Sequence, residues 1–120
     1  FVPPAPDRVP ALMKRFVQSL PVLAKRYHPV VYAALVHKEF VTIHPFVDGN
    51  GRCARLLMNL ALLQHGYEIC SIPPVRRHDY IAAIRKTQTA HRTDEPFIDF
   101  IAEMVYESQK DYLRLIRAMK

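Results

Sequence analysis

Two strongly apolar segments lie on either side of a short polar motif near the middle of this 120-residue chain. The first covers residues 29–43, and its charged side chains are confined to Lys38 and Glu39. The second follows Gly51 and ends at Gly66, a residue that suits the left-handed position just after a helix. A segment that is apolar on nearly every face is typical of a helix buried in the middle of a domain. The chain is therefore predicted to fold around two central helices.

An amphipathic helix is predicted ahead of the central pair. Its apolar positions recur at helical spacing from Asp7 to Leu20, and Asp7 is predicted to be its N-cap. Pro21 is predicted to end or kink this helix. Pro45 is predicted to end the first central helix, because the residue before a proline is displaced from the α region. His44 is therefore expected at a junction between helix and loop.

Two further helices are predicted after the central pair. Residues 75–89 are predicted to form one of them, with Tyr80 facing inward. The last helix is predicted to begin at residues 94–96, and its apolar stripe could extend to Lys120. The final part of that stripe consists of Tyr112, Leu115 and Ile116. No alternating strand pattern or internal repeat occurs, so the predicted fold class is all-α, with a single domain over residues 1–120.

Composition narrows the classes of function. The net charge of +6 makes nucleic acid a candidate partner, because a basic domain gains affinity for phosphate groups by releasing counterions. The basic residues are scattered, however, and a solvated helical surface explains most of them. No apolar run reaches the roughly 18–20 residues of a membrane span, and no signal-peptide pattern opens the chain. Neither nucleic acid nor a membrane is a predicted partner.

The cysteines bear on the cellular location of the protein, and the first residue bears on whether the chain is part of a longer polypeptide. Cys53 and Cys70 are too few for a disulfide framework or a zinc site, so free thiols are predicted. They favour the cytoplasm, another reducing compartment, or delivery into a host cell. Because the chain begins at Phe1 and continues into a proline-rich stretch, it is expected to belong to a longer polypeptide with an N-terminal region.

The polar motif at residues 44–55 concentrates the chemistry of phosphate binding. It reads His-Pro-Phe-Val-Asp-Gly-Asn-Gly-Arg-Cys-Ala-Arg and holds Gly49 and Gly51, two of the three glycines. Such a turn before a helix presents backbone N–H groups to an anion. Arg52 and Arg55 lie three apart in the first helical turn, where their guanidinium groups suit the separate oxygens of a di- or triphosphate.

Asp48 and His44 could supply the remaining chemistry of a transfer reaction. Asp48 could hold a Mg²⁺ ion that bridges phosphate oxygens, or it could only cap the following helix. His44 is a candidate general base, because an imidazole that is neutral at neutral pH can accept a proton, although a lone histidine is more often packed or solvent-facing. Together these residues predict a hydroxyl group, deprotonated by His44, that attacks a phosphorus atom in line.

The pattern His-Pro-Phe-x-Asp-Gly-Asn-Gly-Arg-x-x-Arg resembles the signature of the Fic family. The resemblance extends over essentially the whole chain, through residues 1–4, 56–59, 66–67 and 96–102. It implies a Fic-type helical bundle, in which two central apolar helices flank the active-site loop. It also implies a flap β-hairpin that lies mostly upstream of Phe1.

The resemblance further implies a protein adenylyltransferase, which moves AMP from ATP to a Ser, Thr or Tyr hydroxyl of a target protein and releases pyrophosphate. The motif assigns His44 as the general base, Asp48 as the ligand of Mg²⁺ or Mn²⁺, Gly49, Asn50 and Gly51 as the anion hole, Arg52 as a phosphate contact, and Arg55 as the contact of the terminal phosphate. Phe46 is expected to point into the core and anchor the loop. Tyr80 and Gln88 fall near the family's adenine pocket, although a tyrosine on an apolar stripe is more often a core residue.

The sequence is compatible with more than one mode of regulation and more than one transferred group. The family's inhibitory pattern, Ser or Thr followed four residues later by Glu, occurs nowhere in the chain. An inhibitory glutamate would come from an N-terminal region or an antitoxin-like partner, and it would pair with Arg55. The alternatives are transfer of another nucleotide, of phosphocholine or of a γ-phosphate, removal of AMP, nucleotide binding without turnover, and nucleic-acid contact. Oligomer formation is also open, and His37 is expected to be structural or exposed.

Overall fold

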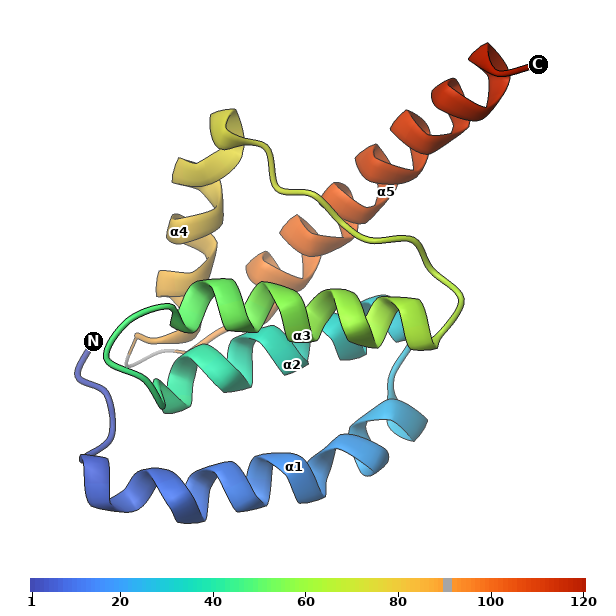
Figure 1. Cartoon of the computed structure of the whole chain (residues 1–120). Coiled ribbons are helices and arrows are strands. Elements are labelled where there is room, and N and C mark those ends of the chain that lie inside the picture. Colours follow the sequence, from blue (N-terminus) through green and yellow to red (C-terminus); the bar gives the residue numbers. More distant parts are fainter. Residues whose placement is uncertain (90–91) are drawn as a thin grey trace.

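Five α-helices make up the part of the chain that the computed structural model describes, residues 1–89 and 92–120 (Figure 1). They are α1 (Val9–Arg26), α2 (Pro29–Ile43), α3 (Asn50–Gln64), α4 (Arg77–Thr87) and α5 (Glu95–Ala118), with short 3-10 turns at Pro6–Arg8 and Pro74–Arg76. Within those residues no strand occurs, and the predicted all-α fold class is confirmed. None of these helices is long and apolar enough to cross a lipid bilayer.

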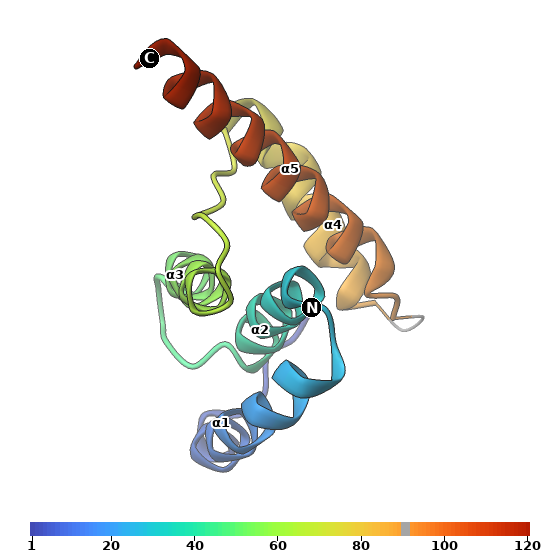
Figure 2. The same cartoon turned by 90° about the vertical axis from the view of Figure 1, so that its right-hand side faces the viewer.

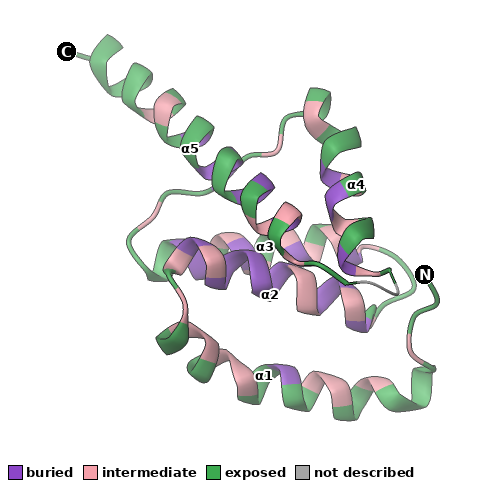
Figure 3. Ribbon diagram, turned by 180° about the vertical axis from the view of Figure 1, so that it is seen from behind, coloured by how far each residue is buried: buried purple, intermediate pink, exposed green. Residues whose placement is uncertain are grey.

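Helix α2 forms the centre of the molecule, as its apolar sequence predicts. It packs against α1, α3 and α5, and α5 also packs against α4 (Figures 1 and 2). Ala33 and Ala34 are fully buried, and the buried surface runs along most of α2 in Figure 3. These small side chains allow neighbouring helices to approach closely, so that α2 supplies a fixed base for the loop that follows it.

Helix α3 is less completely buried than its apolar sequence suggests. Its inner face buries Met58 and Leu62, whereas Leu56, Leu60 and Leu63 on the outer face are at least half exposed. The reason is that α3 packs mainly on α2 and lies at the edge of the bundle (Figure 2). Each cysteine is a free thiol, as predicted, and burial raises the pKa of Cys70 to about 11.

The start of α1 differs from the sequence prediction, whereas Pro21 follows the second of its two predicted alternatives. Asp7 lies inside the 3-10 turn, and Arg8 is the N-cap residue, without a side-chain cap hydrogen bond. A proline suits the first turn of a helix, and Pro10 takes that position in α1. Pro21 does not end the helix, which continues to Arg26. Instead α1 bends, so that its last turns run in a different direction in Figure 2, as a proline inside a helix favours.

The boundaries around the motif agree closely with the prediction. Helix α2 ends just before His44, whose backbone is left-handed with φ 54°. Helix α3 begins at Asn50, earlier than predicted, and ends before Gly66, which has φ 83°. The Tyr67 N–H donates to the Leu62 carbonyl over 2.9 Å, as in a glycine-terminated helix end. The motif is thus a short turn held between two helix ends.

The last two helices form the other side of the bundle. Helix α4 begins at Arg77 rather than residue 75, because residues Pro74–Arg76 form a 3-10 turn. The first half of α5 buries Phe97, Ile101 and Met104. Its last turns project beyond the bundle (Figures 1 and 3). The predicted stripe is therefore not buried at its end, where Tyr112 is half-buried and Leu115 and Ile116 are exposed.

Candidate functional site

The turn between α2 and α3 is closed by the side chain of Asn50. This residue is buried, with 7% of its surface exposed. The Phe46 N–H donates to Asn50 Oδ1 over 3.0 Å, and Asn50 Nδ2 donates to the Phe46 carbonyl over 2.8 Å. The amide therefore satisfies both backbone groups of Phe46. What Asn50 can offer to an anion is its backbone N–H, because its side chain holds the loop.

Gly49 and Gly51 have different backbone roles. Gly49 is the N-cap of α3 and has φ 84°, a conformation that strains any side-chain-bearing residue. Gly51 lies within the first turn of α3 and has no positive φ. A β-carbon at Gly49 would lie 3.3 Å from Arg52 Nη2, and one at Gly51 would lie 3.3 Å from Arg55 Nη1. Both glycines thus leave room for guanidinium groups that fold back over the turn.

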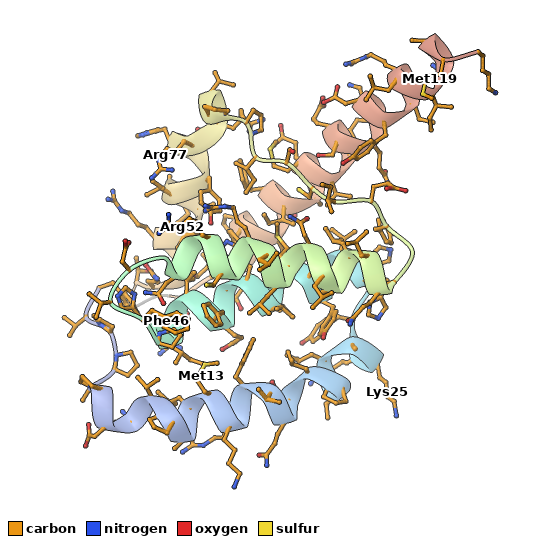
Figure 4. The ribbon with its side chains drawn as sticks, viewed as in Figure 1. Met13, Lys25, Phe46, Arg52, Arg77 and Met119 are labelled. Atoms are coloured by element: carbon orange, nitrogen blue, oxygen red, sulfur yellow. The ribbon has the colours of Figure 1, made fainter. Side chains whose placement is uncertain are left out.

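The arginines and the N-terminus of α3 form one wall of an open pocket of about 460 Å³. Its lining consists of Asp48, Gly49, Gly51, Arg52 and Arg55 around the turn, Arg77, Tyr80, Ile81 and Ile84 from α4, and Val41 from α2. Figure 4 shows Arg77 on α4 and Arg52 on α3 at the same side of the molecule. The first N–H groups of a helix lack intrahelical partners, so this wall attracts anions.

Arg77 was not predicted as a site residue. It precedes Tyr80 by three positions, so both side chains lie on neighbouring positions of one helix surface. This spacing is a signal that could have identified Arg77. Together with Arg52 and Arg55 it gives the pocket three cationic side chains from two helices.

Asp48 is exposed on the turn. Its Oδ1 accepts a hydrogen bond of 2.9 Å from the Gly49 N–H, and its Oδ2 lies 3.6 Å from Arg52 Nη2. Asp48 is not the N-cap residue of α3, because Gly49 occupies that position. No group of three or more His, Cys, Asp or Glu side chains that could hold a metal occurs among the described residues. A cation at Asp48 would therefore need oxygen atoms from a bound ligand.

His44 lies beside a different cavity from the arginines. That cavity, of about 680 Å³, is bordered by His44, Phe46 and Val47 and by the proline-rich segment at residues 2–6. His44 is exposed, and its backbone N–H donates to the Phe40 carbonyl over 3.1 Å. His44 and the arginine side chains thus border the same turn but line separate cavities.

Phe46 does not enter the core as expected. Its side chain is 53% exposed and lies between the turn and α1 in Figure 4. The ring centroid is 6.3 Å from that of Phe40, which itself packs 6.2 Å from Phe16. Because Phe16 and Phe40 already fill this part of the core, the Phe46 ring covers its rim. The turn is anchored by the backbone of Phe46 and the Asn50 amide instead.

Tyr80 joins the pocket to a buried histidine. Its hydroxyl lies 2.6 Å from His37 Nε2 and accepts a hydrogen bond of 3.3 Å from Arg55 Nη1. Burial, and then the positive charge of Arg55, lowers the pKa of His37 to about 3, so the imidazole is neutral. Burial raises the pKa of Tyr80. Gln88, at the C-cap of α4, is not among the residues that line the pocket.

Fold and site together define an all-helical domain with an anion-attracting pocket at the N-terminus of a central helix. The model of the Fic/DOC family matches residues 1–62, and the chain belongs to this family. Two similar sequences are the proteins named protein adenylyltransferase Fic of Drosophila yakuba and Drosophila virilis. They are 42% and 43% identical over 114 residues, which are 93% of this chain and 22% and 23% of those proteins. The chain thus spans about a fifth of their length.

Solved structures of Fic proteins share the fold. A Fic-domain-containing signaling protein from Bacteroides thetaiotaomicron superposes with a TM-score of 0.81 and 30% identity, over 90% of this chain and 46% of that one. Fic-1 from C. elegans gives a TM-score of 0.82 and 32% identity, over 94% of this chain and 34% of that one. The predicted resemblance to the Fic family is confirmed.

Proposed function

We propose that this chain forms the catalytic core of a protein adenylyltransferase that moves AMP from ATP to a Ser, Thr or Tyr hydroxyl of a target protein. The observation that carries the proposal is the pocket at the N-terminus of α3, where Arg52 and Arg55 fold over the glycine turn and Arg77 adds a third cation from α4. Several cations beside unpaired N–H groups suit a polyphosphate better than a single phosphate. The names of the similar Drosophila proteins support the same activity.

The residues divide the reaction between them. His44 accepts the proton of the target hydroxyl, and the hydroxyl oxygen forms a bond to the α-phosphorus of ATP. The bond from that phosphorus to the bridging oxygen breaks, and pyrophosphate leaves. The N–H groups of the turn and the Arg52 guanidinium stabilise the negative charge that develops on the phosphate oxygens. Arg55 contacts the terminal phosphate.

The two cavities beside the turn support separate approach routes for the two substrates. The nucleotide would occupy the arginine pocket, with Tyr80 in its wall. The hydroxyl-bearing segment of the target would approach through the cavity that borders His44 and the proline-rich segment. A hydroxyl that approaches from the His44 side could be deprotonated there and attack the α-phosphorus from the side opposite the pyrophosphate. The role of Gln88 as an adenine contact stays a prediction.

A Mg²⁺ or Mn²⁺ ion fits the donor set at the turn. Asp48 is exposed and offers one carboxylate, and Mg²⁺ typically takes one or two carboxylates together with substrate oxygens. When bound, the ion would neutralise charge on the phosphate oxygens. An inhibitory glutamate from an N-terminal region or from an antitoxin-like partner would compete for Arg55, which already lies free of carboxylates among the described ion pairs.

The test uses ATP labelled at the α-phosphate and, separately, at the γ-phosphate. We expect α-label on protein, either a target in a cell lysate or the domain itself, and no transfer of γ-label. His44→Ala should lower transfer by about 100-fold or more, whereas His78→Ala, at an exposed position of α4 outside the pocket, should not. If only γ-label moves, the domain is a phosphotransferase. If α-label stays off every protein, the adenylyltransferase proposal is wrong.

A further inference from the structure

A chain of three polar side chains runs from the core to the arginine pocket. His37 on α2 is fully buried, with none of its surface exposed. Its Nε2 and the Tyr80 hydroxyl share a hydrogen bond of 2.6 Å, and Arg55 Nη1 donates to the same hydroxyl over 3.3 Å. The Arg55 guanidinium carbon also lies 5.7 Å from the centre of the Tyr80 ring. Arg55 is thus held by both the oxygen and the ring of Tyr80.

His37 has no route to a ligand of its own. Its ring packs 4.9 Å from the Phe97 ring and 5.5 Å from the Tyr80 ring, measured between centroids. Its Nδ1 is buried and has no hydrogen-bond partner within residues 1–89 and 92–120. A buried polar atom without a partner is costly, and an apolar side chain at this position of α2 would avoid that cost. Among the residues that the structure describes, the one side-chain hydrogen bond of His37 is therefore to the Tyr80 hydroxyl.

We infer that His37 is a positioning residue for phosphate binding, because it fixes the Tyr80 hydroxyl that holds the Arg55 guanidinium over the N-terminus of α3. Whichever nitrogen of His37 carries the proton, the Tyr80 oxygen stays between two partners. A guanidinium has five donors and no acceptor, so one N–H bond to Tyr80 leaves the others for a ligand. The inference rests on the anion site of the proposed function.

The energetic reason is pre-organisation of Arg55. A free arginine loses much rotamer freedom when a ligand immobilises it. A guanidinium already held against Tyr80, above the space that Gly51 leaves open, loses less on binding. The buried imidazole thus contributes to the affinity of a site that it does not touch.

The test measures binding of inorganic tripolyphosphate by calorimetry. His37→Leu and Tyr80→Phe should each weaken binding by about five-fold, as expected for loss of one positioning hydrogen bond. His37→Gln, which keeps a polar atom near the Nε2 position, should retain more affinity than His37→Leu. In an Arg55→Ala background, the same substitutions should change affinity by less than about two-fold.

Matched controls separate positioning from folding. Tyr112→Phe removes a hydroxyl from the distant part of α5 and should leave binding unchanged. Thermal unfolding identifies any variant that is not folded. If His37→Leu does not fold, His37→Gln and His37→Asn carry the test of His37, and the cycle between Tyr80→Phe and Arg55→Ala tests whether the hydroxyl acts through Arg55. Equal binding by wild type and folded variants, or losses that persist in the Arg55→Ala background, would overturn the inference, as would the absence of tripolyphosphate binding by the wild type.

The two proposals can fail independently. Tripolyphosphate binding that depends on His37 through Arg55, without transfer of α-label from ATP, would sustain the positioning role and reject adenylyl transfer. Transfer of α-label, with tripolyphosphate binding that ignores His37 and Tyr80, would do the reverse. Tripolyphosphate therefore tests the network at the phosphates, whereas labelled ATP tests the chemistry.

Discussion

Gly49 and Gly51 are equivalent in the sequence motif, but the structure gives them different constraints. Gly49 has φ 84°, whereas Gly51 lies in ordinary helical backbone. Gly49→Ala should destabilise the fold by about 1–2 kcal/mol, because a β-carbon is strained in the left-handed region. Gly51→Ala should leave stability unchanged or raise it by up to about 1 kcal/mol, because alanine favours a helix. Urea unfolding of both variants measures the difference.

The two glycine variants are each other's control, since each adds one methyl group next to an arginine of the same turn. Their added β-carbons would meet guanidinium nitrogens at the same distance of 3.3 Å. A difference in stability between them would thus come from the backbone. Equal losses from both variants would contradict the strain argument.

At the scale of single residues, most of the predicted site is continuous in the chain, and Tyr80 is the one pocket residue that was predicted outside the motif. The motif supplied His44, Asp48 and the two arginines after it, because their spacing is itself the signal. Arg77 and His37 come from helices on either side, and their contacts depend on how α4 and α2 pack. No local pattern specifies that packing.

At the scale of elements, a hydrogen bond between His37 on α2 and Tyr80 on α4 joins two helices. Because His37 is buried, its protonation affects the stability of the fold. Burial, and then Arg55, lowers the pKa of His37 from 6.5 to about 3. Above pH 6.5 the imidazole is neutral in both states, and folding incurs no protonation cost. As the pH falls from 6.5 towards 3, the unfolded chain binds a proton that the folded chain excludes, so stability decreases. The loss should reach about 2 kcal/mol at pH 5, from 1.36 kcal/mol per pH unit.

Urea unfolding at pH 8 and pH 5 measures this dependence. His37→Gln should flatten it, because the glutamine side chain does not titrate. His65→Gln is the matched control, since His65 is exposed at the end of α3, and it should keep the wild-type slope. A wild-type slope in the His37 variant would show that other groups cause the acid sensitivity.

Element boundaries could be predicted where one residue type has a single strong preference. Pro45 and Gly66 marked the ends of α2 and α3 correctly. Asp7 gave the wrong start for α1, because it lies in the 3-10 turn and Arg8 is the N-cap residue. Pro21 left two alternatives, because a proline inside a helical pattern can end the helix or bend it. The last turns of α5 are helical, as the apolar periodicity predicts, but they project beyond the bundle. Periodicity predicts that a helix forms, and it does not predict which element packs against the apolar face of that helix.

At the scale of the whole molecule, the bundle extends over 54 × 30 × 26 Å and places two cavities beside one turn. The all-α class followed from the sequence because each helix has its own apolar pattern. The cavities did not, because they form between elements distant in the chain. Under the proposed function, their separation would let a nucleotide and a protein segment reach the turn from different sides.

The net charge of +6 raises the question of whether anions bind the molecule as a whole or one pocket. Arg77 and Arg85 lie on the same helix and both are exposed, but only Arg77 lines the pocket. Arg77→Gln and Arg85→Gln therefore change the net charge equally. Because salt screens charges beyond about 8 Å at physiological ionic strength, Arg77→Gln alone should weaken tripolyphosphate binding, by about five- to ten-fold.

Titrations of the two variants at 50 and 200 mM KCl test this localisation. Wild type and Arg85→Gln should lose affinity equally as salt increases, whereas Arg77→Gln should start weaker and lose less, because one local cation is gone. Equal weakening by both substitutions would mean that the overall field of the molecule attracts the anion. If only Arg77→Gln weakens tripolyphosphate binding, the positive charge that binds the anion lies where α3 and α4 meet.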